Sequence, residues 1–215
     1  MQYNISRVKA DKMMLSSTRP QLMPTGTSQL TPITLETNRM VVRPFSEADM
    51  TPRYLAWLND VVTLRYSQQG KQKQDLTSCQ AYRKSIITSG GLMLAMCVKK
   101  RDSSLHIGNL TLRPSKTAYQ EIDISILIGD RSEWGRGYAS EAWIAVCTFL
   151  FETRGIQRIT AGTHHDNKAM RALMARTGMQ PFEPLGDTSE ENIYMALVPS
   201  QLIDNLQPAG ANTSC

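Results

Sequence analysis

The chain has 215 residues, 41% of them hydrophobic, and a net charge of +5. This length suits one domain with tails, and the hydrophobic share is enough for a buried core. Four basic residues and one acidic residue fall within residues 1–30, so the remainder is only mildly basic and does not favour a nucleic acid partner. No run reaches the roughly 18 apolar residues of a membrane helix, so no membrane partner is expected.

We expect three regions along the chain. Residues 1–30 lack a periodic apolar pattern and are rich in Ser, Thr, Gln and Met, which predicts a flexible arm. A mitochondrial presequence is the alternative for this segment. Residues 31–198 are predicted to form the folded domain, and residues 199–215 a tail.

The cysteines indicate a reducing compartment. No two of them form a CxxC pair, and two lie in apolar runs, which predicts free buried thiols and therefore a cytoplasmic protein. Without paired cysteines, the three histidines predict no metal site. The four cysteines are Cys79, Cys97, Cys147 and Cys215.

The order of predicted elements indicates a mixed sheet with helices on its faces. Alternating or turn-bounded apolar runs predict the strands, and helical spacing with capping residues and terminal glycines predicts the helices. The first helix is expected to open with a Ser-x-x-Asp capping box at Ser46. The expected strands span 31–45, 92–100, 105–114, 121–129, 156–164, 179–183 and 191–199, and the expected helices span 46–60, 75–91, 138–153 and 167–177.

A glycine-rich turn, "WGRGYASEA" at 134–142, lies between a predicted strand and a buried helix. The first N–H groups of that helix have no partner within it, and glycines allow an anion to approach them closely. Arg136 would add a charge-assisted donor. The turn therefore predicts a phosphate site, with an ordinary glycine-capped turn as the alternative. Neither a Walker A loop nor a dinucleotide fingerprint fits these residues.

Two blocks in the right order resemble the GNAT superfamily of acetyl-CoA-dependent N-acetyltransferases. "WGRGYA" is similar to the family's Q/R-x-x-G-x-G/A loop, with Trp134 in the first position, as in the branch of ribosomal-protein N-terminal acetyltransferases. "HDNKAMRALMARTGM" is similar to the block that follows the next strand. The resemblance runs from Ile33 to about Val198. It implies an α/β fold with a mixed, mostly antiparallel, seven-stranded sheet and four helices on its faces.

The resemblance also implies where acetyl-CoA binds. Backbone groups of the 121–129 strand would hold the pantetheine arm, the amides of the glycine turn would hold the pyrophosphate, and the side chain of Asn167 would contact the cofactor. The residues so implied are Ile126, Leu127, Ile128, Trp134, Gly135, Arg136, Gly137, Tyr138, Ala139, Ser140 and Asn167.

Acetyl transfer to an amine requires a group that accepts the amine's proton. Asp123 is the candidate base, because it lies on the strand that would meet the cofactor, and Glu121 shares its face by period-two alternation. The alternative is that both carboxylates only face solvent. The family's tyrosine, seven residues after the Asn, corresponds to Met174, which cannot donate a proton. His164 and His165 are further candidates by residue type, but each is expected to be structural or exposed.

The resemblance to GNAT enzymes also implies that the acceptor enters over the segment between the first strand and the first hairpin. This segment resembles that of GNAT enzymes that acetylate amino groups on nucleotide-linked deoxysugars. Five basic residues and one acidic residue at 61–90 suit a nucleotide diphosphate, although a solvated helix face is the alternative. Trp57, Tyr66 and Gln69 are the candidate acceptor contacts.

Three other functions stay open at this point. The acceptor could be the N-terminal α-amino group of a protein. The domain could bind acyl-CoA without catalysis, since Met174 removes the expected acid, or it could bind RNA through its basic arm. A homodimer is compatible with the sequence.

Overall fold

The computed structural model describes residues 30–116, 118–184 and 189–203. One sheet of eight strands, in the order β1-β2-β3-β4-β5-β6-β8-β7, forms its centre. All neighbouring strands are antiparallel except β5 and β6. The strands are β1 (Leu35–Glu36), β2 (Met40–Pro44), β3 (Leu92–Lys99), β4 (Ser104–Pro114), β5 (Glu121–Ile128), β6 (Arg158–His164), β7 (Gln180–Pro181) and β8 (Asn192–Leu197). The helices are α1 (Pro52–Leu58), α2 (Leu76–Thr88), α3 (Tyr138–Arg154) and α4 (Lys168–Arg176).

The mixed, mostly antiparallel sheet with four helices is confirmed, but it has eight strands where seven were predicted. The extra strand arises because the predicted strand 31–45 folds back on itself. The backbone N–H of Thr37 donates to the carbonyl of Met40 over 2.9 Å, which makes β1 and β2 an antiparallel pair. Alternation alone cannot reveal such a turn, since both halves keep the same pattern.

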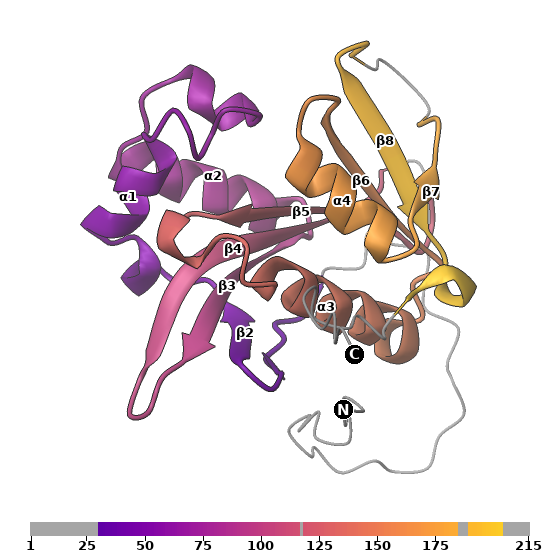
Figure 1. Cartoon of the computed structure of the whole chain (residues 1–215), viewed down its shortest axis with the longest axis horizontal. Coiled ribbons are helices and arrows are strands. Elements are labelled where there is room, and N and C mark those ends of the chain that lie inside the picture. The colour runs from indigo at the N-terminus through magenta and orange to yellow at the C-terminus, as the bar shows by residue number, and fades with distance from the viewer. Residues whose placement is uncertain (1–29, 117, 185–188, 204–215) are drawn as a thin grey trace, which may run out of the picture.

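Each face of the sheet carries its own apolar core. The helices α3 and α4 cover one face and α1 and α2 the other (Figure 1), so successive residues of a central strand enter different cores. On β3, Leu94, Met96 and Val98 belong to the α3/α4 core, whereas Met93, Ala95 and Cys97 belong to the α1/α2 core. Within the described residues no helix has the length and apolar character needed to span a membrane.

The predicted helix 46–60 consists of two parts. Ser46 and Asp49 form the predicted capping box, but it opens a 3-10 turn at Glu47–Asp49, and α1 begins only at Pro52 with Thr51 as its N-cap. The physical reason is Pro52: it disfavours helical geometry in the residue before it, while its own missing N–H is harmless at the first helical position.

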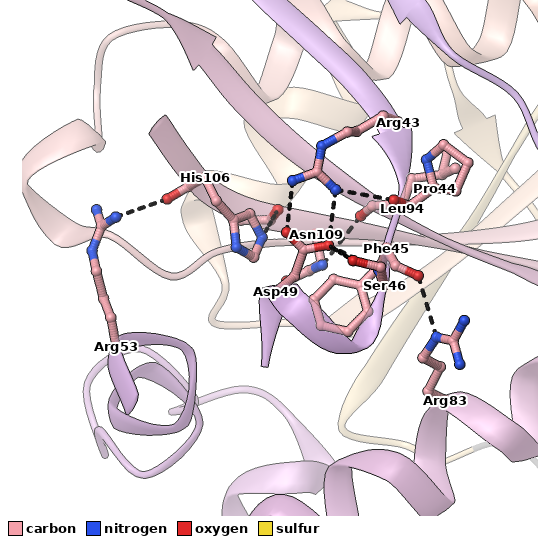
Figure 2. Close-up of polar contacts among 11 residues, drawn as sticks. Arg43, Pro44, Phe45, Ser46, Asp49, Arg53, Arg83, Leu94, His106 and Asn109 are labelled. Carbon is pink, nitrogen blue, oxygen red and sulfur yellow. Dashed lines mark hydrogen bonds and ion pairs between the residues drawn. The ribbon is translucent and has the colours of Figure 1, made fainter. Parts of the chain in front are cut away.

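An ion pair fixes this turn to the sheet (Figure 2). The Arg43 guanidinium donates to both oxygens of Asp49, over 2.8 and 2.6 Å, and the backbone N–H of Ser46 donates to the same carboxylate over 2.8 Å. Burial alone would raise the pKa of Asp49, but the hydrogen bonds from Arg43 and Ser46 outweigh it and lower the pKa to about 2. The charged form of Asp49 is thus the form that stabilises the fold.

We expect Asp49→Asn to destabilise the protein by about 2 kcal/mol at neutral pH, since a pKa unit corresponds to about 1.4 kcal/mol. A lowered pKa stabilises the fold above the unfolded value near 4, and this contribution is lost as the pH falls towards about 2. Thermal unfolding from pH 7 to pH 2 should therefore show the two melting curves converging. Glu36→Gln is the control, because Glu36 pairs with Lys99 at an exposed site and should change little. Equal stability of wild type and Asp49→Asn at pH 7 would contradict the expectation.

Both ends of the described chain lie against the domain. The N–H of Leu30 donates to the carbonyl of Gly90 over 2.9 Å, and the N–H of Ile203 donates to the carbonyl of Thr177 over 3.2 Å. A Cβ at Gly178 would lie 1.9 Å from the Gln201 carbonyl oxygen, so the chain after β8 requires glycine there. Residues 1–29 of the predicted arm and 204–215 of the predicted tail lie outside the described residues.

Candidate active site

The sheet opens between its two parallel strands. β5 and β6 pair at only three positions, the last being Asp123 with Thr160. Beyond that pair β5 stays bonded only to β4, and β6 only to β8, and the two strands diverge (Figure 1). The facing edges therefore carry backbone N–H and C=O groups with no strand partner in the described structure. Such groups require hydrogen bonds, which the amide groups of a ligand lying along these edges would supply.

The cofactor-binding candidates on β5 lie beyond the point of divergence. Ile126 and Ile128 pack towards the α3/α4 core, and Leu127 packs towards the α1/α2 core. Their side chains thus pack partly buried on both faces, and their backbone groups along the edge of β5 are the ones directed between β5 and β6.

The glycine turn follows β5 directly. Gly135 and Gly137 have φ values of +73° and +81°, and Gly137 is the N-cap of α3. This left-handed conformation is the reason that the turn needs glycine. A Cβ at Gly135 would meet nothing within 4 Å, and at Gly137 only Arg39 Nη2 at 3.5 Å. The space in front of the turn is therefore open, at the positive end of a 17-residue helix.

Neighbouring groups hold the turn in place. The Trp134 indole N–H donates to the carbonyl of Ile128 over 2.8 Å. Arg39, from the β1–β2 turn, donates to the Arg136 carbonyl over 2.9 Å, pairs with Glu141 at 2.6 Å, and lies over the Tyr138 ring at 4.6 Å. Sequence reasoning missed Arg39, and no local signal could reveal a contact across 97 positions.

The charge of Arg136 is partly balanced within the turn. Its Nη1 lies 3.3 Å from Oε2 of Glu133, a carboxylate only 7% exposed, whose other oxygen lies 4.0 Å from Lys100 Nζ. The guanidinium itself is 55% exposed. Glu133 Oε2 is buried and has no hydrogen-bond partner within the described structure, so the charge of Arg136 is what compensates it, while more than half of the Arg136 side chain remains open to solvent.

The first turn of α3 supplies the remaining candidates in the glycine turn. Tyr138 and Ser140 are 9% and 8% exposed, and Ala139 packs against the α3/α4 core. Buried side chains leave these residues to act through their backbone N–H groups, which are those that a helix leaves unpaired.

Asn167 is the N-cap of α4. Its side-chain oxygen accepts from the Met170 N–H over 3.2 Å, and its amide nitrogen donates to Thr163 Oγ1 over 3.0 Å. The side chain thus joins α4 to β6 on one border of the opening. One amide hydrogen is available beyond these two bonds, so a ligand contact is compatible with the capping role.

Asp123 lies where β5 and β6 diverge, with 46% of its side chain exposed. Desolvation by the surrounding strands raises its pKa; the nearby Arg113 guanidinium opposes this and the Glu121 carboxylate adds to it. Since water still reaches nearly half of the side chain, proton exchange with solvent is open. A carboxylate whose pKa is shifted towards the working pH is suited to act as a base.

Glu121 shares this face of β5 but is already paired. Its carboxylate accepts a hydrogen bond from Arg158 Nε, at the register position opposite it on β6, and only 11% of its side chain is exposed. This ion pair holds the Glu121 side chain, so Asp123 is the more accessible of the two carboxylates.

The three acceptor candidates have different surroundings. Trp57 is 7% exposed and its ring lies against Gly129 and, edge to face, against His106 at 5.2 Å, so it is a core residue of the α1/α2 side. Tyr66 is 37% exposed and stacks on His164 at 5.5 Å, which places it beside the end of β6. Gln69 lies in a 3-10 turn at Gln68–Lys71.

The histidine pair lies at the end of β6 with one potential metal cluster. Ligand atoms of His164, His165 and Asp166 lie within 4.8 Å of one another. His164 Nδ1 accepts from the Asp166 N–H, and His165 Nδ1 contacts the Glu191 carbonyl at 2.9 Å. One nitrogen of each imidazole is therefore engaged by the backbone, and two of the three residues are exposed.

The structure also describes Met174 and three of the four cysteines. Met174 is fully buried in the α3/α4 core, so α4 presents no proton donor at that position. Cys79, Cys97 and Cys147 are free and buried, as predicted, while Cys215 lies outside the described residues.

A family model described as an acetyltransferase (GNAT) domain matches residues 39–180, a range that includes the opening, the glycine turn and α4. The chain belongs to the GNAT acetyltransferase family. Its members transfer an acyl group to an amine, which is the chemistry predicted from the sequence.

Similarity to individual proteins is consistent with this family. An uncharacterized N-acetyltransferase, YoaA of Bacillus subtilis (strain 168), is 24% identical over 176 residues, covering 78% of this chain and 98% of YoaA. A GNAT-family acetyltransferase from Bacillus anthracis has a TM-score of 0.65 at 14% identity, covering 77% of this chain and 98% of that one. Mycobacterium smegmatis RimJ, in complex with CoA-disulfide, has a TM-score of 0.58 at 17% identity, covering 76% of this chain and 83% of its own. At these identities the two structures show that this GNAT acetyltransferase shares their fold.

Proposed function

We propose that this acetyltransferase uses acetyl-CoA and transfers its acetyl group to the primary amine of a small molecule. The observation that carries the proposal is the divergence of β5 and β6 beside an open glycine turn at the start of α3. The RimJ structure of the same fold contains a CoA derivative, which supports CoA as the ligand of this opening.

In this proposal the pyrophosphate of acetyl-CoA binds the N–H groups of residues 135–140, and Arg136 adds a charged donor. The pantetheine amides take the backbone partners that β5 lacks beyond Asp123. The thioester then lies between β5 and β6, and the acceptor approaches from the α1/α2 side. Trp134 and Asn167 hold the two borders through their bonds to Ile128 and Thr163.

Asp123 has the role of base. The amine gives its proton to this carboxylate, directly or through water, and attacks the thioester carbon; the C–S bond then breaks and leaves CoA as a thiolate that solvent protonates. The raised pKa of Asp123 favours this step at physiological pH. The neighbouring Glu121 stays paired with Arg158.

For the acceptor we propose an amino sugar carried on a nucleotide. The support is the excess of basic residues at 61–90 and the exposed Tyr66 ring beside β6, which offers a stacking surface for a sugar or base. The N-terminal α-amino group of a protein is the second candidate. We place the reaction in the cytoplasm, because the three described cysteines are free thiols.

A panel of acceptors tests this proposal. Amine-dependent release of the CoA thiol is followed with nucleotide-linked amino sugars, unmodified amino sugars and peptides with free N-termini. We expect the highest kcat/KM with the nucleotide-linked amino sugars. Preference for the peptides would select the second candidate, and binding of acetyl-CoA with no amine-dependent turnover would make the chain a non-catalytic acyl-CoA-binding domain.

A further inference from the structure

An arginine stands beside the proposed base on the face that the acceptor would approach. Arg113 on β4 is the register partner of Asp123 on β5, and its Nη1 lies 3.7 Å from Asp123 Oδ1. The same nitrogen lies 3.4 Å from Ser125 Oγ, and Nη2 donates to the hydroxyl of Tyr82 on α2. Strands β4 and β5 and helix α2 thus hold one guanidinium at the edge of the opening.

The pairing of Arg113 with Asp123 is loose compared with other ion pairs of the fold. The contacts of Arg43 with Asp49 are 2.6–2.8 Å long, within hydrogen-bond range, whereas 3.7 Å is outside it. Arg113 is 35% exposed and Asp123 46% exposed. Each group therefore has room for a second partner of opposite charge.

Tyr82 and Ser125 fix the guanidinium independently of Asp123. They are neutral, so they orient Arg113 without cancelling its charge. Glu121, the other carboxylate on this face of β5, is held by Arg158 and does not compete. An oriented, half-open arginine is suited to bind a carboxylate or a phosphate through two parallel hydrogen bonds.

We propose that Arg113 binds an anionic group of the acceptor, a carboxylate or phosphate close to the amine that Asp123 deprotonates. This inference rests on the proposed function and narrows its substrate class to amines that carry a negative charge. Asp123 and Arg113 together are complementary to such a molecule: the ammonium faces the carboxylate, and the anion faces the guanidinium. Tyr82 is the positioning residue for the arginine.

The test compares charged and uncharged acceptors in pairs that share the same amine. Glucosamine 1-phosphate against glucosamine tests a phosphate, and alanine against alaninamide tests a carboxylate. We expect wild type to favour the charged member of one pair by about 10- to 100-fold in kcat/KM, in line with about 1.5–3 kcal/mol for a hydrogen bond to a charged group. The pair that shows this preference identifies the anion.

Arg113→Gln should remove the preference by raising KM for the charged acceptor, and Tyr82→Phe should reduce it. Arg176→Gln is the matched control, because it removes the same charge from α4, where Arg176 Nε donates to the carbonyl of Ala172 over 3.2 Å, and the preference should persist. The CoA-induced rise in melting temperature checks that each variant is folded.

Two results would overturn the inference alone. One is turnover by wild type with no preference in either pair. The other is an equal loss of kcat for charged and uncharged acceptors in Arg113→Gln, which would mean that Arg113 only positions Asp123. Absence of turnover with every amine would instead overturn the proposed function, and the inference with it.

Discussion

Gly137→Val is expected to abolish the rise in melting temperature that CoA or acetyl-CoA gives the wild type. A ligand that binds only the native state stabilises it by mass action, so loss of binding removes the shift. The branched side chain would extend into the open space in front of α3, where only Arg39 Nη2 lies near the position of the Cβ. That space is where the phosphates are proposed to bind.

The control for this variant lies at the other end of the same helix. Gly155 is the C-cap of α3, with φ at +65°, and a Cβ there would meet only Gln120 Nε2 at 4.0 Å. Gly155→Val therefore imposes a similar backbone strain, of order 1–3 kcal/mol, without touching the turn. It should melt at a lower temperature yet keep the full CoA shift. A full shift in Gly137→Val would place the phosphates elsewhere.

Asp123→Asn is expected to lower kcat about 10²- to 10⁴-fold, the usual range for general acid–base catalysis, while the affinity for acetyl-CoA stays unchanged. The reason is that Asn keeps the shape of the side chain but cannot accept the amine's proton. Steady-state kinetics with a saturating acceptor, together with CoA titration, measures both quantities.

The dependence of the rate on pH provides a second test of Asp123 as the base. Asp123 acts as a base only when it is deprotonated, so the wild-type rate rises with pH through the pKa of Asp123, which desolvation raises. The rate of the Asp123→Asn variant should not show this rise with pH. Glu121→Gln is the control: the rise of rate with pH should persist but move to lower pH, because the Glu121 carboxylate contributes to the raised pKa of Asp123. An unchanged rate and profile in Asp123→Asn would show that Asp123 is not the base.

Local chemistry explains which parts of the site the sequence predicts. Gly135 and Gly137 are visible because a left-handed turn before a helix requires glycine. Asn167 is instead implied by the family resemblance, and the structure adds that it is the N-cap of α4. The boundaries of α3 follow from the same signals: its range Tyr138–Arg154 extends the predicted helix 138–153 by one residue.

The other features of the site depend on tertiary structure and cannot be predicted from local sequence. Nothing in the sequence of β5 or β6 says that their pairing stops after Asp123, because that limit is set by how the two halves of the sheet diverge. Trp57 is interpreted from sequence as an acceptor contact, but it packs on Gly129, 72 positions away in the chain. Arg113 is seen beside Asp123 only once the register of β4 and β5 is known.

Hydrogen exchange with and without CoA tests the central claim, that the ligand lies between β5 and β6 with its phosphates at the glycine turn. Backbone N–H groups on the edge of β5 beyond Asp123 have no strand partner in the described structure, so they should exchange quickly in the free protein. CoA should protect residues 124–128 and 135–140, and leave the β1–β2 pair unchanged. Binding of CoA without protection in either segment, or with protection confined to α1, β7 and β8, would contradict the account.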